Sequence, residues 1–149
     1  NFPELKRFNY IITEMNAAYH RAAQRVGLSD SAMSILYSAC DNGGSRALND
    51  ICRSSGLSKQ TIGSSLHKLI ADGYICLDES RGKLKTVILT ENGAAFAEET
   101  VIPILRIENE IFGEWDRSEL ESYISLTQRF LDSFKEKTAK MPNKIKGEK

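Results

Sequence analysis

The stretch that decides the fold runs from residue 48 to residue 71 and reads LNDICRSSGLSKQTIGSSLHKLIA. A short helix fits residues 48–54, Gly56 breaks it, and Ser58 can cap a second helix that ends near Ala71. A glycine permits the sharp bend that two short helices need where they join. The spacing therefore predicts a helix-turn-helix.

The second helix of this motif has an apolar and a polar face. Ile62, Leu66, Leu69 and Ile70 form the apolar stripe. The other face carries small polar, amide and basic side chains, which are the types that reach base edges and phosphates. A solvated face of an ordinary amphipathic helix has a similar composition, so the neighbouring elements must decide between the two readings. The predicted DNA-contacting residues of this helix are Ser58, Lys59, Gln60, Thr61, Ser64, His67 and Lys68.

Two β-type runs, 74–78 and 84–90, follow this helix. They predict a hairpin, and Arg81, Lys83 and Lys85 alternate at its tip. A basic hairpin suits the negative potential of the minor groove. Because it follows a helix-turn-helix, we interpret it as the wing of a DNA-binding domain.

A long helix precedes these elements. Apolar residues recur at steps of three and four from Leu5 to Val26, which is typical of a helix that packs along another helix, here expected over residues 3–26. Gly27 is expected to end it. Ser29 can cap a further helix, which ends at the turn cluster 41–45.

The region after the hairpin is also helical. Thr90 can cap it, Pro103 should break it near residues 100–102, and Asp116 with Glu119 forms a capping box before the last helix. We expect the terminal helices to form a homodimer, whereas burial of the first helix within its own bundle is the alternative. The expected dimerisation residues are Leu5, Phe8, Ile12, Met15, Leu120, Ile124, Leu131 and Phe134.

The charges are distributed unevenly although their total is zero. Residues 46–90 contain seven basic and four acidic residues, whereas residues 91–134 contain ten acidic and three basic ones. Residues 135–149 contain six basic and two acidic residues. Such an arrangement can produce a local electric field at zero net charge. The charge balance therefore does not exclude DNA binding, and it places the expected DNA-binding surface within residues 46–90.

The expected fold is mainly α with one small β-hairpin, a winged helix-turn-helix with long terminal dimerisation helices. We expect one domain over residues 1–140, with the DNA-binding lobe at 29–90 and dimerisation segments at 1–27 and 91–140. Residues 141–149 are expected to form a basic, flexible tail. The hairpin is the only β structure that the pattern predicts.

The chain resembles the MarR family of winged-helix transcriptional regulators over about residues 3–138. Similar blocks are Leu28-Ser29 with Ile35-Leu36, the stretch 48–75, and Leu89-Thr90-Glu91-Asn92-Gly93, in this order. The resemblance implies a homodimer that binds a palindromic operator in double-stranded DNA through the 58–71 helix and the wing. It also implies a response to a small aromatic effector or to an oxidant.

The chain departs from this family in two respects. The family's wing commonly carries an Asp-x-Arg pair, at positions that hold Arg81 and Lys83 in this chain. Lysine lacks the planar fork of arginine, so Arg81 could carry the minor-groove contact instead. Oxidant-sensing members often use a cysteine in the first helix, whereas the first cysteine here is Cys40.

Three tyrosines are candidates for an effector cleft between the dimerisation helices and the DNA-binding lobe. They are Tyr10, Tyr19 and Tyr37. The alternative is that they pack between helices.

The remaining signals are negative or structural. Cys40, Cys52 and Cys76 are expected to be small buried hydrophobes, and their odd number without a Cys-x-x-Cys pair suggests a reducing, cytoplasmic setting. The histidines His20 and His67 are isolated, so we expect neither a metal nor a cofactor. The sequence contains no catalytic motif, membrane span or secretory signal.

These patterns predict a non-enzymatic transcriptional regulator, a dimeric repressor that a small ligand releases from DNA. One alternative is a winged-helix module that binds protein and not DNA. Another is a dimerisation domain taken from an enzyme.

Overall fold

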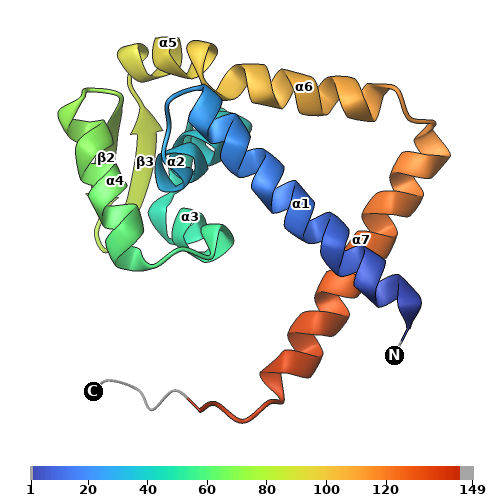
Figure 1. Ribbon diagram of the computed structural model, residues 1–149. Coiled ribbons are helices and arrows are strands. Elements are labelled where there is room, and N and C mark those ends of the chain that lie inside the picture. Colours follow the sequence, from blue (N-terminus) through green and yellow to red (C-terminus); the bar gives the residue numbers. More distant parts are fainter. Residues whose placement is uncertain (1, 145–149) are drawn as a thin grey trace. The chain divides into compact units, whose positions relative to one another are not determined.

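The described part of the chain folds into helices and three short strands (Figure 1). The computed structural model describes residues 2–144, apart from the side chain of Arg81. No described helix is long and apolar enough to cross a membrane. In chain order the elements are α1 (Pro3–Arg25), α2 (Asp30–Asp41), β1 (Ser45–Ala47), α3 (Leu48–Ser55), α4 (Lys59–Ala71), β2 (Ile75–Arg81), β3 (Leu84–Leu89), α5 (Glu91–Glu99), α6 (Val101–Gly113) and α7 (Arg117–Ala139).

Hydroxyl side chains set where three helices begin. The Oγ atoms of Ser29 and Ser58 and the Oγ1 of Thr90 each accept a hydrogen bond from the backbone N–H three residues later, at 3.2, 3.1 and 2.9 Å. Each bond satisfies one of the N–H groups that the first turn of a helix leaves without a partner. All three predicted caps are confirmed.

Two glycines end helices in left-handed backbone conformations. Gly27 follows α1 with φ +74°, and Gly56 follows α3 with φ +66°. Side chains disfavour this region of φ, so glycine is the residue that allows each sharp change of direction. The predicted end of the first helix and the predicted turn of the helix-turn-helix are therefore confirmed.

The core is centred on α2, which packs against α3, α4, β1 and β3. Ile35 and Leu36 of α2 are fully buried, as are Ile51 of α3, Ile62 of α4 and Val87 of β3. Full burial of such side chains contributes about 1.5–3 kcal/mol each. This one core therefore fixes the helix-turn-helix on the sheet that carries the hairpin.

The sheet has three antiparallel strands in the order β1-β3-β2, so it is larger than the hairpin alone. The strand that the sequence did not predict, β1, pairs Arg46 with Val87. It contains three residues and follows a turn cluster, so it is too short to show an alternating pattern. Its pairing gives β3 a neighbour on each side.

Two expected core residues are at the surface. Cys40 and Cys52, which were expected to be buried, are half-buried and pack against the core, whereas Cys76 is exposed. Residues alternate between the faces of a strand, and in β2 the preceding residue, Ile75, occupies the buried face. Ile70, at the edge of the apolar stripe of α4, is 36% exposed.

The chain divides into two compact units, Asn1–Ile107 and Glu108–Lys149. The expected dimerisation segment 91–140 is thus shared between them. Helix α5 ends as predicted, because Thr100 leaves the helical conformation with φ −121° and ψ −77° just before Pro103 enters the first turn of α6. The predicted capping box is also present, where the backbone N–H of Asp116 donates to Glu119 at 3.0 Å.

Candidate nucleic-acid interface

The polar face of α4 is exposed along its whole length. All seven candidate residues of this helix and its cap, from Ser58 to Lys68, are exposed. Some of the hydroxyls bond within the helix: Ser58 contacts Thr61 at 2.8 Å, and Ser64 donates to the Gln60 carbonyl at 3.0 Å. The side chains of Gln60 and His67 make no hydrogen bond to another described residue. The face therefore presents a free amide and a free imidazole between hydroxyl groups held in fixed positions.

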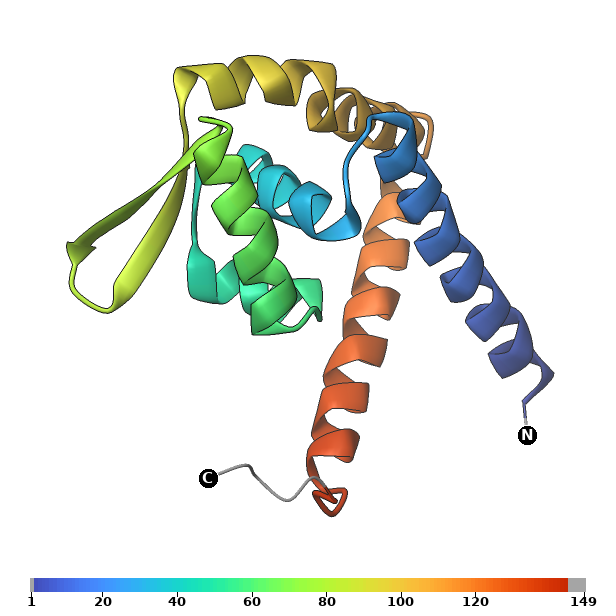
Figure 2. The same ribbon diagram turned by 60° about the vertical axis from the view of Figure 1, so that its left-hand side comes forward.

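The hairpin of β2 and β3 projects beyond the helices of its unit (Figure 2). The strand register shifts between Asp78 and Arg81, and Gly82 forms the turn with φ +72°. The Asp78 carboxylate accepts a hydrogen bond from the Ser80 backbone N–H at 2.9 Å, which braces this irregular tip. Lys83 is exposed there, whereas the side chain of Arg81 lies outside the described part of the chain.

An acidic residue faces one of the three wing cations. The Glu79 carboxylate lies 3.4 Å from the ammonium of Lys85, across the hairpin. Both side chains are about half exposed, so the pair contributes little to stability. It nevertheless offsets one of the positive charges that the wing would offer to a phosphate. The sequence analysis did not identify this pair, because it depends on the register of the two strands.

The base of the hairpin is fastened to α4 and α5. The Thr90 hydroxyl donates to the Gly73 carbonyl at 2.5 Å, and the Thr90 N–H donates to the Tyr74 carbonyl at 3.1 Å. The rings of Tyr74 and Phe96 are stacked, with their centroids 4.0 Å apart. These contacts hold the end of α4, the start of β2 and α5 together, so the helix and the wing are attached to one frame.

The two long terminal helices carry rows of exposed apolar side chains. In α1 the row includes Leu5, Phe8, Ile12 and Met15, and only its end near Val26 packs against the core of its own unit. In α7 no described residue is buried, and Phe134 is 56% exposed. Contiguous apolar surface of this kind usually marks an interaction site. The other exposed residues of the expected α7 row are Ile124 and Leu131, whereas Leu120 is partly buried.

Two of the three candidate cleft tyrosines lie on different sides of α1. Tyr10 is 67% exposed, and Tyr37 packs half-buried against the core. Tyr10 and Tyr19 are nine residues apart on α1, which is about two and a half helical turns, so they lie on opposite sides of that helix. Within one chain Tyr10 and Tyr19 therefore face different directions, and a role of the three tyrosines in an effector cleft stays a prediction.

No metal-binding cluster occurs in the described part of the chain: no three or more His, Cys, Asp or Glu side chains meet there. His20 instead contacts Asp30 at 2.8 Å, which joins α1 to the start of α2. Burial, and secondarily the negative charge of Glu98, raise the pKa of the Cys40 thiol above its usual value.

The fold is similar to those of known regulators, although neither a protein-family model nor a curated protein matches the sequence. A MarR family regulator from Neisseria meningitidis superposes with a TM-score of 0.79 at 18% identity, covering 93% of this chain and 98% of that chain. S. aureus MepR in a DNA-binding conformation superposes with a TM-score of 0.72 at 18% identity, covering 89% of this chain and 99% of MepR. The PcaV regulator from Streptomyces coelicolor, in complex with its natural ligand, superposes with a TM-score of 0.57 at 16% identity, covering 83% of this chain and 91% of PcaV.

These likenesses extend over most of the chain and over most of each regulator. They agree with the element order, in which a helix-turn-helix is followed by a hairpin and flanked by long helices. The chain therefore has the winged helix-turn-helix fold of MarR family regulators.

Proposed function

We propose that the chain is a DNA-binding transcriptional regulator. The exposed polar face of α4, set on the same frame as a projecting basic hairpin, is the observation that carries this proposal. A helix of this kind fits the major groove, and the wing reaches the adjacent minor groove or backbone. The similarity to S. aureus MepR in a DNA-binding conformation supports the same assignment.

The proposed regulator acts as a homodimer. The exposed apolar rows on α1 and α7 are the surfaces that a second copy would bury. A twofold dimer places two copies of α4 on half-sites about 34 Å apart, so the operator is a palindrome. Repression then follows because the bound dimer occludes the promoter.

A small ligand releases the proposed repressor from DNA by favouring a protomer arrangement that does not fit the two half-sites. The similar PcaV structure contains that protein's natural ligand, which supports control of this kind. The three free cysteines fit a reducing compartment such as the cytoplasm.

Selection of genomic DNA fragments by the purified chain, followed by footprinting, tests the proposal. We expect enrichment of fragments that share a palindrome and two protected half-sites one helical turn apart. Gln60→Ala should reduce discrimination between bases, since a glutamine amide reads adenine, whereas Asn49→Ala, at an exposed position of α3, serves as the control. Enrichment no greater than for random DNA would overturn the proposal and favour a module that binds protein.

A further inference from the structure

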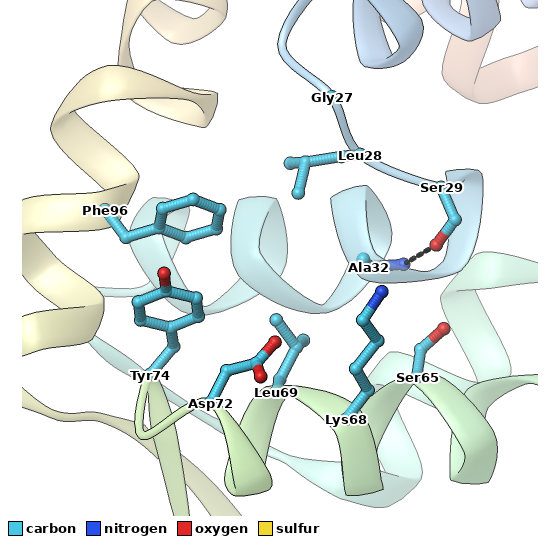
Figure 3. A pocket seen from close by; sticks show the side chains of 10 residues that line it. All are labelled: Gly27, Leu28, Ser29, Ala32, Ser65, Lys68, Leu69, Asp72, Tyr74 and Phe96. Atoms are coloured by element: carbon cyan, nitrogen blue, oxygen red, sulfur yellow. Dashed lines mark hydrogen bonds between the residues drawn. The ribbon is translucent and has the colours of Figure 1, made fainter.

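A small cavity of about 240 Å³ lies between α2, α4 and α5 (Figure 3). Ser65, Lys68 and Leu69 of α4, with Asp72 at the C-cap of that helix, line one side. The other lining residues are Gly27, Leu28, Ser29, Ala32, Tyr74 and Phe96. Pockets for drug-sized molecules span about 300–1,000 Å³, so this cavity suits a smaller metabolite.

The cavity contains one positive and one negative side chain that do not neutralise each other. Lys68 and Asp72 are four residues apart, which places them on the same side of α4. Neither forms an ion pair with any residue that the structure describes. In Figure 3 the Lys68 ammonium points toward the start of α2, while the Asp72 carboxylate lies beside Leu69 and Tyr74.

The residue order gives an ion pair between the two charges little support. A helix favours an acid that precedes a base by four residues, because this order agrees with the helix dipole, and here the base comes first. Both charges therefore remain available to a ligand at separate positions on one wall.

Apolar side chains form part of the cavity lining, and a chain of hydroxyls lies at one end. Leu69 is 4% exposed, and the stacked rings of Tyr74 and Phe96 cover the side toward α5. At the other end, Ser31 bonds both to Ser29, at 3.2 Å, and to Ser65. This chain of hydroxyls joins α2 to α4 beside the Lys68 ammonium.

We propose that the cavity binds a free α-amino acid with an apolar side chain. The Lys68 ammonium pairs with the ligand's carboxylate, and the Asp72 carboxylate pairs with its α-ammonium. The ligand's side chain packs against Leu28, Leu69 and Phe96. A ligand with only a carboxylate would leave Asp72 unpaired near a second negative charge. A ligand with only an amine would leave Lys68 unpaired near a second positive charge. The wall therefore selects a zwitterion.

The ligand also regulates DNA binding, an extension that rests on the proposed function. Lys68 belongs to the exposed polar face of α4 and to the cavity. An amino acid that binds in the cavity holds the Lys68 ammonium there. This withdraws one cation from the DNA phosphates. Each lost phosphate contact reduces the slope of log affinity against log salt by about 0.9.

Isothermal titration calorimetry of the full chain without DNA tests the binding site. The probes are L-leucine and L-phenylalanine, with 4-methylpentanoate and 3-methylbutylamine as analogues of leucine that each lack one charge. We expect at least one amino acid to bind, and Lys68→Gln and Asp72→Asn to weaken it by about tenfold each, the usual effect of removing one charged hydrogen-bonding partner. Lys59→Gln, on the same helix but outside the cavity, should leave the affinity unchanged.

Two results would overturn the site: no binding of either amino acid, or equal binding of L-leucine and 4-methylpentanoate. Because calorimetry does not involve DNA, this failure is distinct from a failure of the proposed function. A second titration, of DNA affinity against the amino acid that binds, tests the regulation. A DNA affinity that is unchanged at saturating ligand would overturn the regulatory role and leave the binding site intact.

Discussion

The backbone of Gly93 in α5 lies directly against the carbonyl group of Tyr74, so that a β-carbon at position 93 would be 1.8 Å from the Tyr74 oxygen. The same oxygen accepts the hydrogen bond of the Thr90 N–H. Only a residue without a side chain permits both contacts. The close approach seats the first turn of α5 on the residue that precedes β2, the first strand of the wing.

Gly93→Ala should lower the free energy of unfolding by about 1–3 kcal/mol, because the obstructing atoms belong to the backbone and cannot rotate away. Urea denaturation followed by circular dichroism measures the change. Gly63→Ala is the matched control, because Gly63 lies in α4 with open space around its β-carbon position. This substitution should raise the free energy of unfolding by about 0.5–1 kcal/mol. Equal midpoints for the wild type and Gly93→Ala would contradict the close approach.

The features predicted correctly from the sequence are those that depend on neighbouring residues. Ser29, Ser58 and Thr90 cap helices through bonds to groups three residues away, so their role is visible in a short window of sequence. Gly56 bends the chain where it stands. The helix-turn-helix and the hairpin followed from such local signals.

The features that were missed depend on pairing between distant segments. The short strand β1 is defined by its partner β3, more than 35 residues later. The Lys85–Glu79 pair depends on the register of the hairpin, and the exposure of Cys76 depends on which face of the sheet covers the core. The cavity around Lys68 likewise joins three separate parts of the chain.

Cys40 should react with iodoacetamide more slowly than the exposed Cys76 at pH 8. Burial and the charge of Glu98 raise the pKa of Cys40, so less of the reactive thiolate is present at a given pH. Its alkylation rate, followed by peptide mass spectrometry, should still be rising above pH 9.0. Glu98→Gln should lower this pKa and speed the reaction, with Glu99→Gln as the control. Equal rates for both cysteines in the native chain would argue against the protected position of Cys40.

Phe8→Glu and Ile12→Glu should weaken the proposed dimer by about 100-fold each, because each places an unpaired charge in an apolar interface. Size-exclusion chromatography with light scattering measures the mass as a function of concentration. Tyr10→Glu is the control, since Tyr10 lies on the opposite side of α1 from the apolar row that contains Phe8 and Ile12. A wild-type chain that is monomeric at every concentration, or a Tyr10 variant that dissociates as strongly, would reject the assigned face.

Lys83→Gln should reduce DNA affinity more than Lys85→Gln, although both remove one wing cation. Glu79 already offsets the charge of Lys85 at 3.4 Å, whereas Lys83 has no ion-pair partner among the described residues. Fluorescence anisotropy across a salt series should show the slope falling by about 0.9 for Lys83→Gln and by less for Lys85→Gln.

Glu79→Gln separates the effect of the pair from a general effect of charge. It should strengthen DNA binding in the wild-type background, because Lys85 is then free to contact a phosphate, but much less in the Lys85→Gln background. Glu121→Gln, which removes an acid from an exposed pair with Arg117 on α7, is the control for total charge. If Glu79→Gln strengthens binding equally with and without Lys85, the carboxylate acts on the DNA directly and the pair does not limit the contribution of Lys85.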